Sequence, residues 1–457
     1  MRRAAANKMF KLKYNVLSLI QIFFGFLNSV LLLKIFGVSI YTDAYFMGDI
    51  ILGGLVMVQM MAVEQFMYVY NELKARDRES AHALYAYALW LSLVIGIGSF
   101  VVINLFSGSV ITVFAYKLDP ARLAVLKRLF PVFSLLAVFN PLNFLNFRLL
   151  NAEGRFAYPY ALGIIPSFFS SCAMLFLYFS GTSDIMTLLA ASVGGNAAAG
   201  LLGLWAVRSS GVPVRLAAGH PSARSLISSS FKVRFGYNIN NILAPLITNN
   251  MLSAFSAGSV SYFGYAWKIV TVVGNLTTGP SARMFASGIS LAWPEKNVRR
   301  IKAMAREYLR LIAPLFCVSV LLAYAGLPWV LRLVASARLG GAEITVIQLM
   351  FLALSGWYFT GLIESASIQI CMAGQLSKVF IINNSVFVAA YLSAAWAAKG
   401  VLGIYSIPAG LITAQLISLM LYYRSACGLL GSLDSGGKGS APGPEAGSPA
   451  ARRPGWN

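Results

Sequence analysis

The chain has 457 residues, of which 58% are hydrophobic and only 11% are charged, and its formal net charge is +21. Soluble domains carry about 25% charged residues, so this composition excludes an ordinary soluble protein. It also argues against a nucleic-acid partner, because Lys and Arg fall mostly in short stretches between apolar segments rather than on one basic face.

About twelve apolar segments follow one another, each close to the 20 or so residues that a helix needs to cross a bilayer. The first six are predicted near 14–36, 44–70, 82–108, 124–146, 157–179 and 185–207. After a basic linker at 208–234, six more are predicted near 235–256, 259–282, 305–334, 344–371, 378–397 and 402–424. Residues 425–457 are rich in Gly, Ser and Pro, which predicts a disordered tail. Because lipid offers the backbone no hydrogen-bond partner, the fold class is an all-α polytopic membrane protein.

The two halves repeat with a shift of 220 positions. The first segment carries small or polar residues on one helix face, at Ser18, Gln21, Gly25 and Asn28. The shift places the matching set on the seventh segment, at Asn238, Asn241, Pro245 and Thr248. Six segments per half is an even number, so residues 1–207 and 235–424 are expected to form two parallel six-helix bundles. Such repeats are typical of transporters whose bundles rock about a central site.

The basic residues are concentrated in alternate loops, near 2–13, 74–78, 148–155, 208–234 and 296–302. The opposite set of loops is poorer in Lys and Arg. Because cytoplasmic loops carry the excess of positive charge, both termini are expected in the cytoplasm.

The polar stripes have two interpretations. Gln21, Asn28, Asn238, Asn241 and Thr248 either line a wet cavity or form hydrogen bonds between helices. Their recurrence in both halves favours a cavity that binds substrate.

Ionisable residues inside a span cost about 2.5–3.5 kcal/mol each, so they are candidate functional groups. Lys268 either faces a central cavity that holds an anionic head group or extends to the outer interface beside Trp267. Asp49 falls one position beyond Lys268 under the shift, so the two residues are candidates for a gate between the halves.

Two further carboxylates are candidates for gating or ion coupling. Glu364 lies in the middle of a span, where it either binds a coupling cation or a proton, or is a structural carboxyl with a partner. Asp43 follows Thr42 just before the second span, where an N-cap of that helix is the alternative to a gating role.

No catalytic motif is present, so the chain is not expected to be an enzyme. It lacks a nucleophile elbow and a phosphate-binding loop. The four cysteines and two histidines are scattered without zinc-ligand spacing. We therefore expect no metal site and no cofactor.

Three stretches resemble the MurJ/MviN family of lipid II flippases. Ile35-Phe36-Gly37 with Thr42-Asp43-Ala44-Tyr45-Phe46 resembles the family's helix 1–2 junction. Gly258-Ser259-Val260-Ser261 with Tyr265-Ala266 resembles its helix 7–8 junction. Leu150-Asn151-Ala152-Glu153-Gly154-Arg155-Phe156 resembles its turn between helices 4 and 5. The resemblance covers residues 14–424 and extends to the wider multidrug/oligosaccharidyl-lipid/polysaccharide (MOP) exporter superfamily.

The resemblance implies a multi-pass flippase of the bacterial inner membrane that moves a polyprenyl-diphosphate-linked saccharide by alternating access. The implied partners are the lipid-linked saccharide, membrane lipids, a coupling cation (Na⁺ or H⁺) and envelope glycosyltransferases. The family carries cavity arginines on helices 1 and 2, but the matching positions here fall near Ile22, Asn28 and Val56. Lys268 is then the main cation retained.

Two alternatives stay open. An ion-coupled multidrug efflux antiporter of the same superfamily would have an aromatic and acidic cavity, whereas an anionic lipid head group requires a polar, cationic one. A non-transporting scaffold of an envelope polysaccharide machine would have a closed, apolar interface between the halves.

Overall fold

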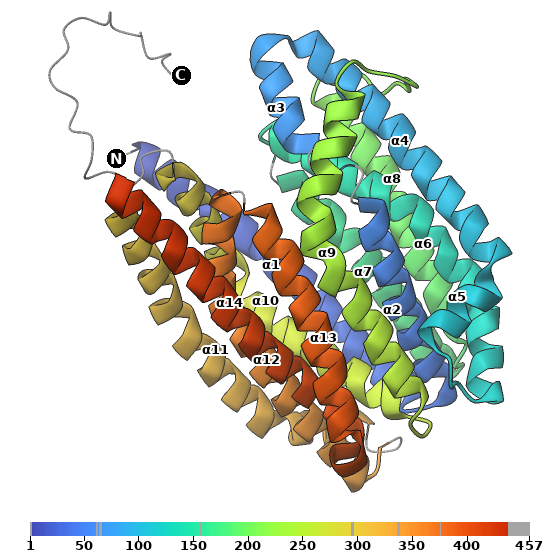
Figure 1. Ribbon diagram of the computed structural model, residues 1–457. Coiled ribbons are helices and arrows are strands. Elements are labelled where there is room, and N and C mark those ends of the chain that lie inside the picture. Colours follow the sequence, from blue (N-terminus) through green and yellow to red (C-terminus); the bar gives the residue numbers. More distant parts are fainter. Residues whose placement is uncertain are drawn as a thin grey trace, which may run out of the picture.

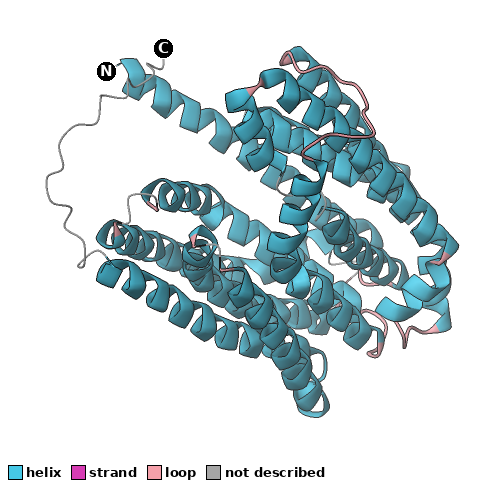
Figure 2. Ribbon diagram, turned by 45° about the horizontal axis from the view of Figure 1, so that its top comes forward, coloured by secondary structure: helices cyan, strands magenta, loops and turns pink. Residues whose placement is uncertain are grey.

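The computed structural model describes residues 2–60, 63, 66–155, 157–293, 297–335, 339–374 and 376–436. In these ranges the chain is helical with short loops and no strand (Figure 2). The first half contains α1 (Arg2–Phe36), α2 (Ile40–Met60), α3 (Phe66–Arg76), α4 (Arg78–Leu105), α5 (Ser107–Phe114), α6 (Pro120–Ala152), α7 (Ala157–Ser180) and α8 (Ile185–Ser209). The second half contains α9 (Ala223–Ser253), α10 (Ser259–Ala292), α11 (Val298–Ala335), α12 (Gly341–Ala373), α13 (Ser377–Leu402), a 3₁₀ turn (Gly403–Tyr405) and α14 (Ser406–Gly436).

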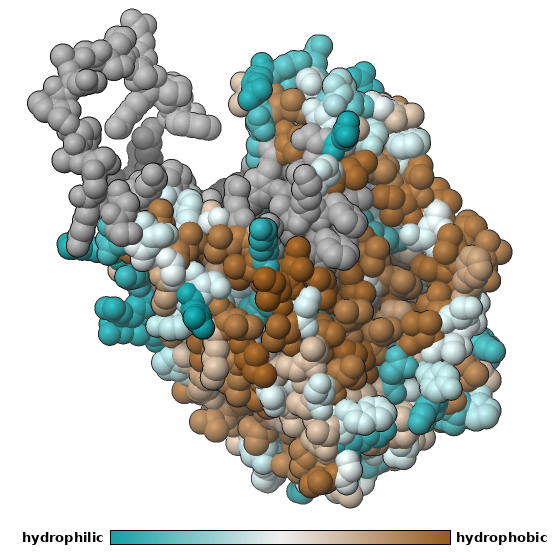
Figure 3. All heavy atoms as spheres, viewed as in Figure 1, coloured by the Kyte–Doolittle hydropathy of each residue, from teal (hydrophilic) through white to brown (hydrophobic). Residues whose placement is uncertain are grey.

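The fold is that of a polytopic membrane protein, as expected. Nine stretches of the described residues are long and apolar enough to cross a membrane, and one of them, Lys378–Asp434, covers both α13 and α14. Apolar side chains dominate the band across the middle of the face in Figure 3, with hydrophilic residues at its upper and lower ends. The exact number of spans stays a prediction.

Helix starts are set by local caps. The side chain of Asp77 caps α4, that of Asp119 caps α6 and that of Asp184 caps α8, each accepting a hydrogen bond from a backbone N–H of the first turn. Pro120 follows Asp119 at the first helical position, where its missing N–H costs nothing.

Helix starts in the second half follow those in the first by about 220 positions, as the sequence repeat predicts. Helices α4 and α11 begin at residues 78 and 298, and α6 and α12 at 120 and 341. Helices α7 and α13 begin at 157 and 377, and α8 and α14 at 185 and 406. In Figure 1 the second-half helices α11–α14 form one group and α2–α8 another, with the start of α1 and the end of α14 at the same end of the molecule.

The structure differs from the sequence prediction at three boundaries. The segment expected at 44–70 contains two described helices, α2 to Met60 and α3 from Phe66, and Tyr70 and Lys74 of α3 bond Glu153. The linker is shorter than 208–234, because α9 begins at Ala223 and Leu226 packs into the core of the first half. Residues 425–436, expected to belong to a disordered tail, continue α14, and Leu430 is buried. Residues 437–457 lie outside the described residues.

Candidate functional site

The buried carboxylate of Asp43, in the first turn of α2, joins the two halves at one end of the molecule. Its Oδ2 accepts a hydrogen bond from the backbone N–H of Gly258 at 2.7 Å. Its Oδ1 accepts from the backbone N–H of Ser261 at 2.8 Å and from the Ser261 hydroxyl at 2.5 Å. Gly258 is the N-cap residue of α10. Asp43 therefore caps a helix of the other half, with its charge at the positive end of the α10 dipole, rather than capping its own helix.

Glycine is required at position 258 for two reasons. The backbone there is left-handed, with φ of +92°. A Cβ at this position would lie 2.7 Å from Cγ1 of Val38, which is closer than real contacts allow. The absence of a side chain lets the start of α10 approach the start of α2, so that the Asp43 carboxylate reaches its backbone.

Arg122, in the first turn of α6, also contacts the Asp43 carboxylate and is only 3% exposed. Its Nη1 lies 3.5 Å from Oδ2 of Asp43, and its Nη2 donates to the carbonyl of Phe255 at 3.0 Å, in the loop between α9 and α10. Its Nε donates to Asp119. Burial disfavours the charged form of Asp119, but the hydrogen bonds and charge of Arg122 outweigh it, so the pKa of Asp119 lies below its usual value.

Further hydrogen bonds join the halves at the same end. The hydroxyl of Tyr265 donates to the carbonyl of Gly37 at 2.8 Å. Asn249 Nδ2 donates to the carbonyl of Met47 at 3.3 Å. Asn250 Nδ2 donates to the carbonyl of Val113 at 2.6 Å, and its Oδ1 accepts from the N–H of Tyr116 at 3.1 Å. We call this set the Asp43 latch: Asp43, Arg122, Asn249, Asn250, Ser261 and Tyr265.

Lys268 lies on α10, two turns beyond Ser261, and faces α2. Its Nζ is 5.1 Å from the ring centroid of Phe46 and 5.5 Å from that of Tyr45, as a cation over aromatic faces. The charges of Lys268 and Asp49 interact across the interface between α10 and α2. In the described part of the chain they form no ion pair within 4.0 Å. The structure thus brings Asp49 and Lys268 near each other, and their gating and binding roles stay predictions.

Two of the stripe residues form hydrogen bonds inside their own half. Asn28 Nδ2 donates to the carbonyl of Ser167 at 3.0 Å, and its Oδ1 accepts from the hydroxyl of Ser171 at 2.6 Å. The buried hydroxyl of Thr248 lies 2.7 Å from the hydroxyl of Tyr391 on α13. These bonds tie α1 to α7 and α9 to α13.

The other stripe residues are placed differently. Gln21 is exposed, and its Nε2 lies against the backbone of Gly163 on α7. Asn241 is half-buried and has an interaction partner. The side chain of Asn238 lies outside the described part of the structure. Substrate binding by these five residues stays a prediction.

Glu364 lies deep in the second half and is 4% exposed. Gln415 Nε2 and the hydroxyl of Ser418, both on α14, donate hydrogen bonds to its two carboxylate oxygens. Asn383 on α13 donates to the carbonyl of Ser418 at 3.2 Å, while its buried Oδ1 has no partner among the described residues. Helices α12, α13 and α14 therefore enclose a small polar cluster in an apolar surrounding.

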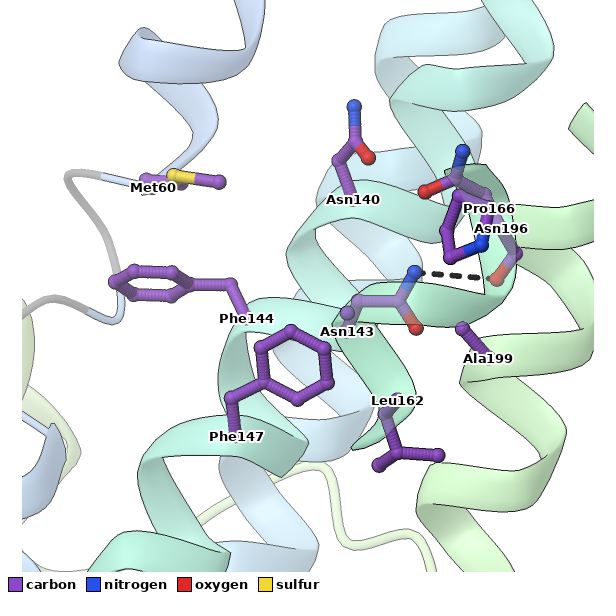
Figure 4. A pocket seen from close by; sticks show the side chains of 10 residues that line it. Met60, Asn140, Asn143, Phe144, Phe147, Leu162, Pro166, Asn196 and Ala199 are labelled. Atoms are coloured by element: carbon purple, nitrogen blue, oxygen red, sulfur yellow. Dashed lines mark hydrogen bonds between the residues drawn. The ribbon is translucent and has the colours of Figure 1, made fainter. Parts of the chain in front are cut away.

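A pocket of about 240 Å³ lies inside the first half, where α2, α6, α7 and α8 meet (Figure 4). Asn140, Asn143 and Asn196 supply its amide groups, and Phe144 and Phe147 supply aromatic faces. We call it the amide pocket. Sequence reasoning missed it, although Asn140 and Asn143 are three positions apart on one helix face.

Sequence reasoning also missed most of the Asp43 latch. It named Asp43 as a candidate but gave no role to Arg122 or Asn249. The latch brings together residues from α2, α6, α9 and α10, so no local spacing marks it.

A sequence model of the lipid II flippase MurJ family matches residues 32–370, well over half of the chain. No curated protein matches the chain. The described residues contain no group of three or more His, Cys, Asp or Glu side chains that could hold a metal ion.

Solved structures of two kinds are similar. A lipid II flippase MurJ in an inward closed conformation has a TM-score of 0.74 at 15% identity, covering 92% of this chain and 90% of that one. A multidrug resistance MATE family transporter of the MOP superfamily has a TM-score of 0.76 in an inward-facing conformation, at 13% identity and with 92% and 99% covered. An outward-facing structure of such a transporter has a TM-score of 0.67 at 13% identity, with 92% and 95% covered. At these identities the likeness shows the fold.

Proposed function

Because this chain belongs to the MurJ family of lipid II flippases, we propose that it moves a polyprenyl-diphosphate-linked saccharide to the outer leaflet of a bacterial inner membrane. Two bundles alternate in exposing a site between them, with both termini in the cytoplasm. The Asp43 latch is the observation that carries the mechanism, because it joins the halves at the end that the loop charges assign to the outside. The TM-score is higher with the inward-facing transporter than with the outward-facing one, which supports an inward-facing state that is closed toward the outside.

The latch works as a gate because its strongest hydrogen bonds join the two halves. Its central acceptor is a carboxylate in the first half, and its donors are backbone N–H groups in the second. Hydrogen bonds to a charged group contribute about 1.5–3 kcal/mol each, so the closed state is stable but within reach of binding energies. Opening toward the outside requires water to replace these donors around Asp43.

Lys268 is the proposed contact for the diphosphate. An anion entering a cavity of low dielectric constant needs a compensating positive charge. Lys268 supplies it on the face of α10 that packs against α2, below the latch. Asp49 is the counter-charge when no substrate is bound. A lysine acts as a point charge here, without the paired hydrogen bonds of an arginine.

The test is translocation of a polyprenyl-diphosphate saccharide by the purified protein in liposomes. We expect Lys268→Glu and Lys268→Ala to eliminate translocation and Lys268→Arg to keep part of it. Lys34→Glu is the matched control, since Lys34 also lies over an aromatic ring, that of Tyr178, but within the first half. Normal translocation by Lys268→Glu would show that Lys268 does not bind the diphosphate.

Glu364 is the proposed coupling residue, binding a proton or Na⁺. Hydrogen bonds of the Glu364 carboxylate join α12 to α14, so a cation bound by this carboxylate would alter the packing of the two helices. Glu364→Gln keeps the shape and removes the charge, so we expect it to transport without responding to an imposed ion gradient. An unchanged response to both a pH and a Na⁺ gradient would show a structural carboxyl instead.

A multidrug efflux antiporter is the second candidate, favoured by the fold shared with MATE transporters. Export of cationic dyes by the same liposomes, insensitive to Lys268→Glu, would support it. A flippase of this kind would also contact the envelope glycosyltransferases that supply or use the saccharide.

A further inference from the structure

The first turns of α11 carry a row of basic side chains on their exposed face. Its members, all exposed, are Arg299, Lys302, Arg306 and Arg310. The last three follow the first by three, seven and eleven residues, a spacing that places all four on one side of a helix. We call this row the α11 basic stripe. In Figure 1 α11 lies at the outer edge of the group formed by α11–α14.

The stripe is poorly compensated by negative charge. Among the described residues, none of its four cations lies within 4.0 Å of a carboxylate. The sequence from 298 to 310 contains five basic residues and one acidic residue, Glu307. The first turn of α11 has no acidic side chain, although the helix dipole favours anions and disfavours cations there. The dipole and the stripe therefore both attract an anion from outside the chain.

The matching part of the first half is built differently. Helix α4, which corresponds to α11 in the repeat, has Asp77 as its cap and Glu79 in its first turn. Around it the basic side chains have carboxylate partners: Arg76 lies 2.9 Å from Glu72, and Lys74 and Arg78 lie 2.8 Å and 3.9 Å from Glu153. The uncompensated charge at the start of α11 is thus a property of the second half, not of the repeated fold.

The exposed residues of α11 place the stripe at the edge of the membrane. Beyond Arg310 the helix exposes apolar side chains, at Leu311, Leu315, Val318 and Leu322. Trp329, which is also exposed, is a residue type typical of the boundary between lipid and water. It lies roughly 28 Å along the helix from Arg310, close to the 30 Å or so of hydrocarbon. With Trp329 at one boundary, Arg310 lies at the other and Arg306 one turn beyond it.

We propose that the α11 basic stripe binds the head groups of anionic phospholipids, in the leaflet that the loop charges assign to the cytoplasm. A phospholipid matches both parts of this face, because its phosphate meets the cations while its acyl chains lie along the exposed apolar residues that follow. A soluble anion would match the cations alone. This inference goes beyond the proposed function and does not depend on which substrate is transported.

Cys317 offers a position for a reporter. It is exposed and lies seven residues beyond Arg310, on the same side of the helix. In a background without the other three cysteines, a bimane dye on Cys317 is quenched by any neighbouring lipid whose acyl chains carry bromine. The full-length protein is reconstituted in phosphatidylcholine with a minor proportion of phosphatidylglycerol, and only one of the two lipids is brominated in each sample.

We expect phosphatidylglycerol to occupy this position about fivefold more often than its share of the bilayer, which corresponds to about 1 kcal/mol, the contribution of one cation near an anionic surface. Raising the salt to about 1 M should remove most of this preference, because the screening length falls to about 3 Å. Quenching in proportion to bilayer composition, or a preference that persists in high salt, would overturn the inference.

Variants separate the stripe from the general positive charge of the protein. Replacing its four residues with Gln is expected to abolish the preference. The matched control places Gln at four exposed basic positions of the first half and lowers the net charge equally: Arg76, Arg155, Arg208 and Arg224. We expect this control to keep the preference. An equal loss in both variants would show attraction by net charge, and so would overturn the inference.

A competition experiment distinguishes lipid from a soluble anion. Inorganic phosphate is added at constant ionic strength, and the preference for phosphatidylglycerol is expected to remain. Its loss would mean that the stripe binds free phosphate instead of a head group. Translocation in the same liposomes is a separate measurement, since a protein that binds the lipid without translocating a saccharide keeps the stripe and contradicts only the proposed function.

Discussion

At the scale of single residues, Asp43 concentrates the contact between the halves. One carboxylate accepts hydrogen bonds from two backbone N–H groups and a hydroxyl of the second half and also faces Arg122. Two of its donors are main-chain groups, which a change of side chain other than to proline leaves in place. The contact at Asp43 itself is therefore most directly weakened by changing the carboxylate.

Asp43→Asn makes this change. Asn has one acceptor oxygen, so one N–H of Gly258 or Ser261 loses its partner, and Arg122 keeps only Asp119 as a counter-charge. We expect the outward-open population to rise about tenfold or more, since at least one charged hydrogen bond is lost. The measurement is the rate at which a cysteine at position 39 reacts with an impermeant maleimide in a cysteine-free background.

The matched control is Asp184→Asn. Asp184 caps α8 at the same end of the molecule but bonds only residues of its own half. We expect it to leave the reaction rate unchanged. An equal rise in both variants would mean that capping in general, not the latch, governs access.

Residue-scale prediction from sequence succeeded for burial and failed for partners. Glu364 is buried in the middle of a helix as expected, but its donors Gln415 and Ser418 come from another helix. Asp43 has the residue type and position of a cap, and local pattern assigned it to the wrong helix. Hydrogen bonds across 200 positions depend on packing, which spacing does not encode.

At the scale of elements, α3 is held by a charged cluster at the end of α6. Glu153 accepts a hydrogen bond from the Tyr70 hydroxyl at 2.6 Å and pairs with Lys74 at 2.8 Å, with Arg78 at 3.9 Å. Burial raises the pKa of Glu153, but these hydrogen bonds and charges lower it further, so the net pKa lies below its ordinary value of 4.5. Charged Glu153 therefore holds α3 against the end of α6.

The pH dependence of this attachment follows from the sign of the shift. A carboxyl whose pKa is lower in the folded state contributes stability above its unfolded pKa, and this is lost as pH falls through the folded pKa. We expect Glu153→Gln to reduce amide protection in α3 about tenfold at pH 7. The difference from wild type should shrink below about pH 4.5. Hydrogen exchange measures both, and a difference that grows in acid would contradict the linkage.

The end of α2 and the start of α3 were not predicted from the sequence. No Gly or Pro lies between residues 60 and 66, so nothing in the local sequence signals a boundary. Apolar residues resume after Glu64 and Gln65 and continue to residue 70, and a single span was expected. The contacts of Tyr70 and Lys74 with Glu153 attach α3 to the end of α6, and no local spacing displays them. By contrast, the starts of α4, α6 and α8 have Asp caps that a sequence displays.

At the scale of the whole molecule, the repeat was readable because it is a property of the chain rather than of packing, whereas the orientation inferred from the loop charges stays a prediction. Helix starts separated by about 220 positions confirm the order of elements in the two halves. The angle between the halves was not readable, because the latch sets it through contacts that neither half makes alone.

Orientation is tested by labelling single cysteines from one side of the membrane. In a background without Cys172, Cys317, Cys371 and Cys427, we expect Arg76→Cys and Arg299→Cys to react only from the cytoplasm. Thr182→Cys should react only from outside. All three positions are exposed, so access depends on sidedness rather than burial. The reverse pattern would invert the proposed direction of transport.

The length of α14 has a practical consequence. Its 31 residues extend about 46 Å, well beyond the roughly 30 Å of hydrocarbon that a helix must cross. Because the helix is continuous from Ser406 to Gly436, a fluorophore attached near its end would move together with the second half. Paired with a second dye on α3, it would convert each change of state into an optical signal from a single molecule.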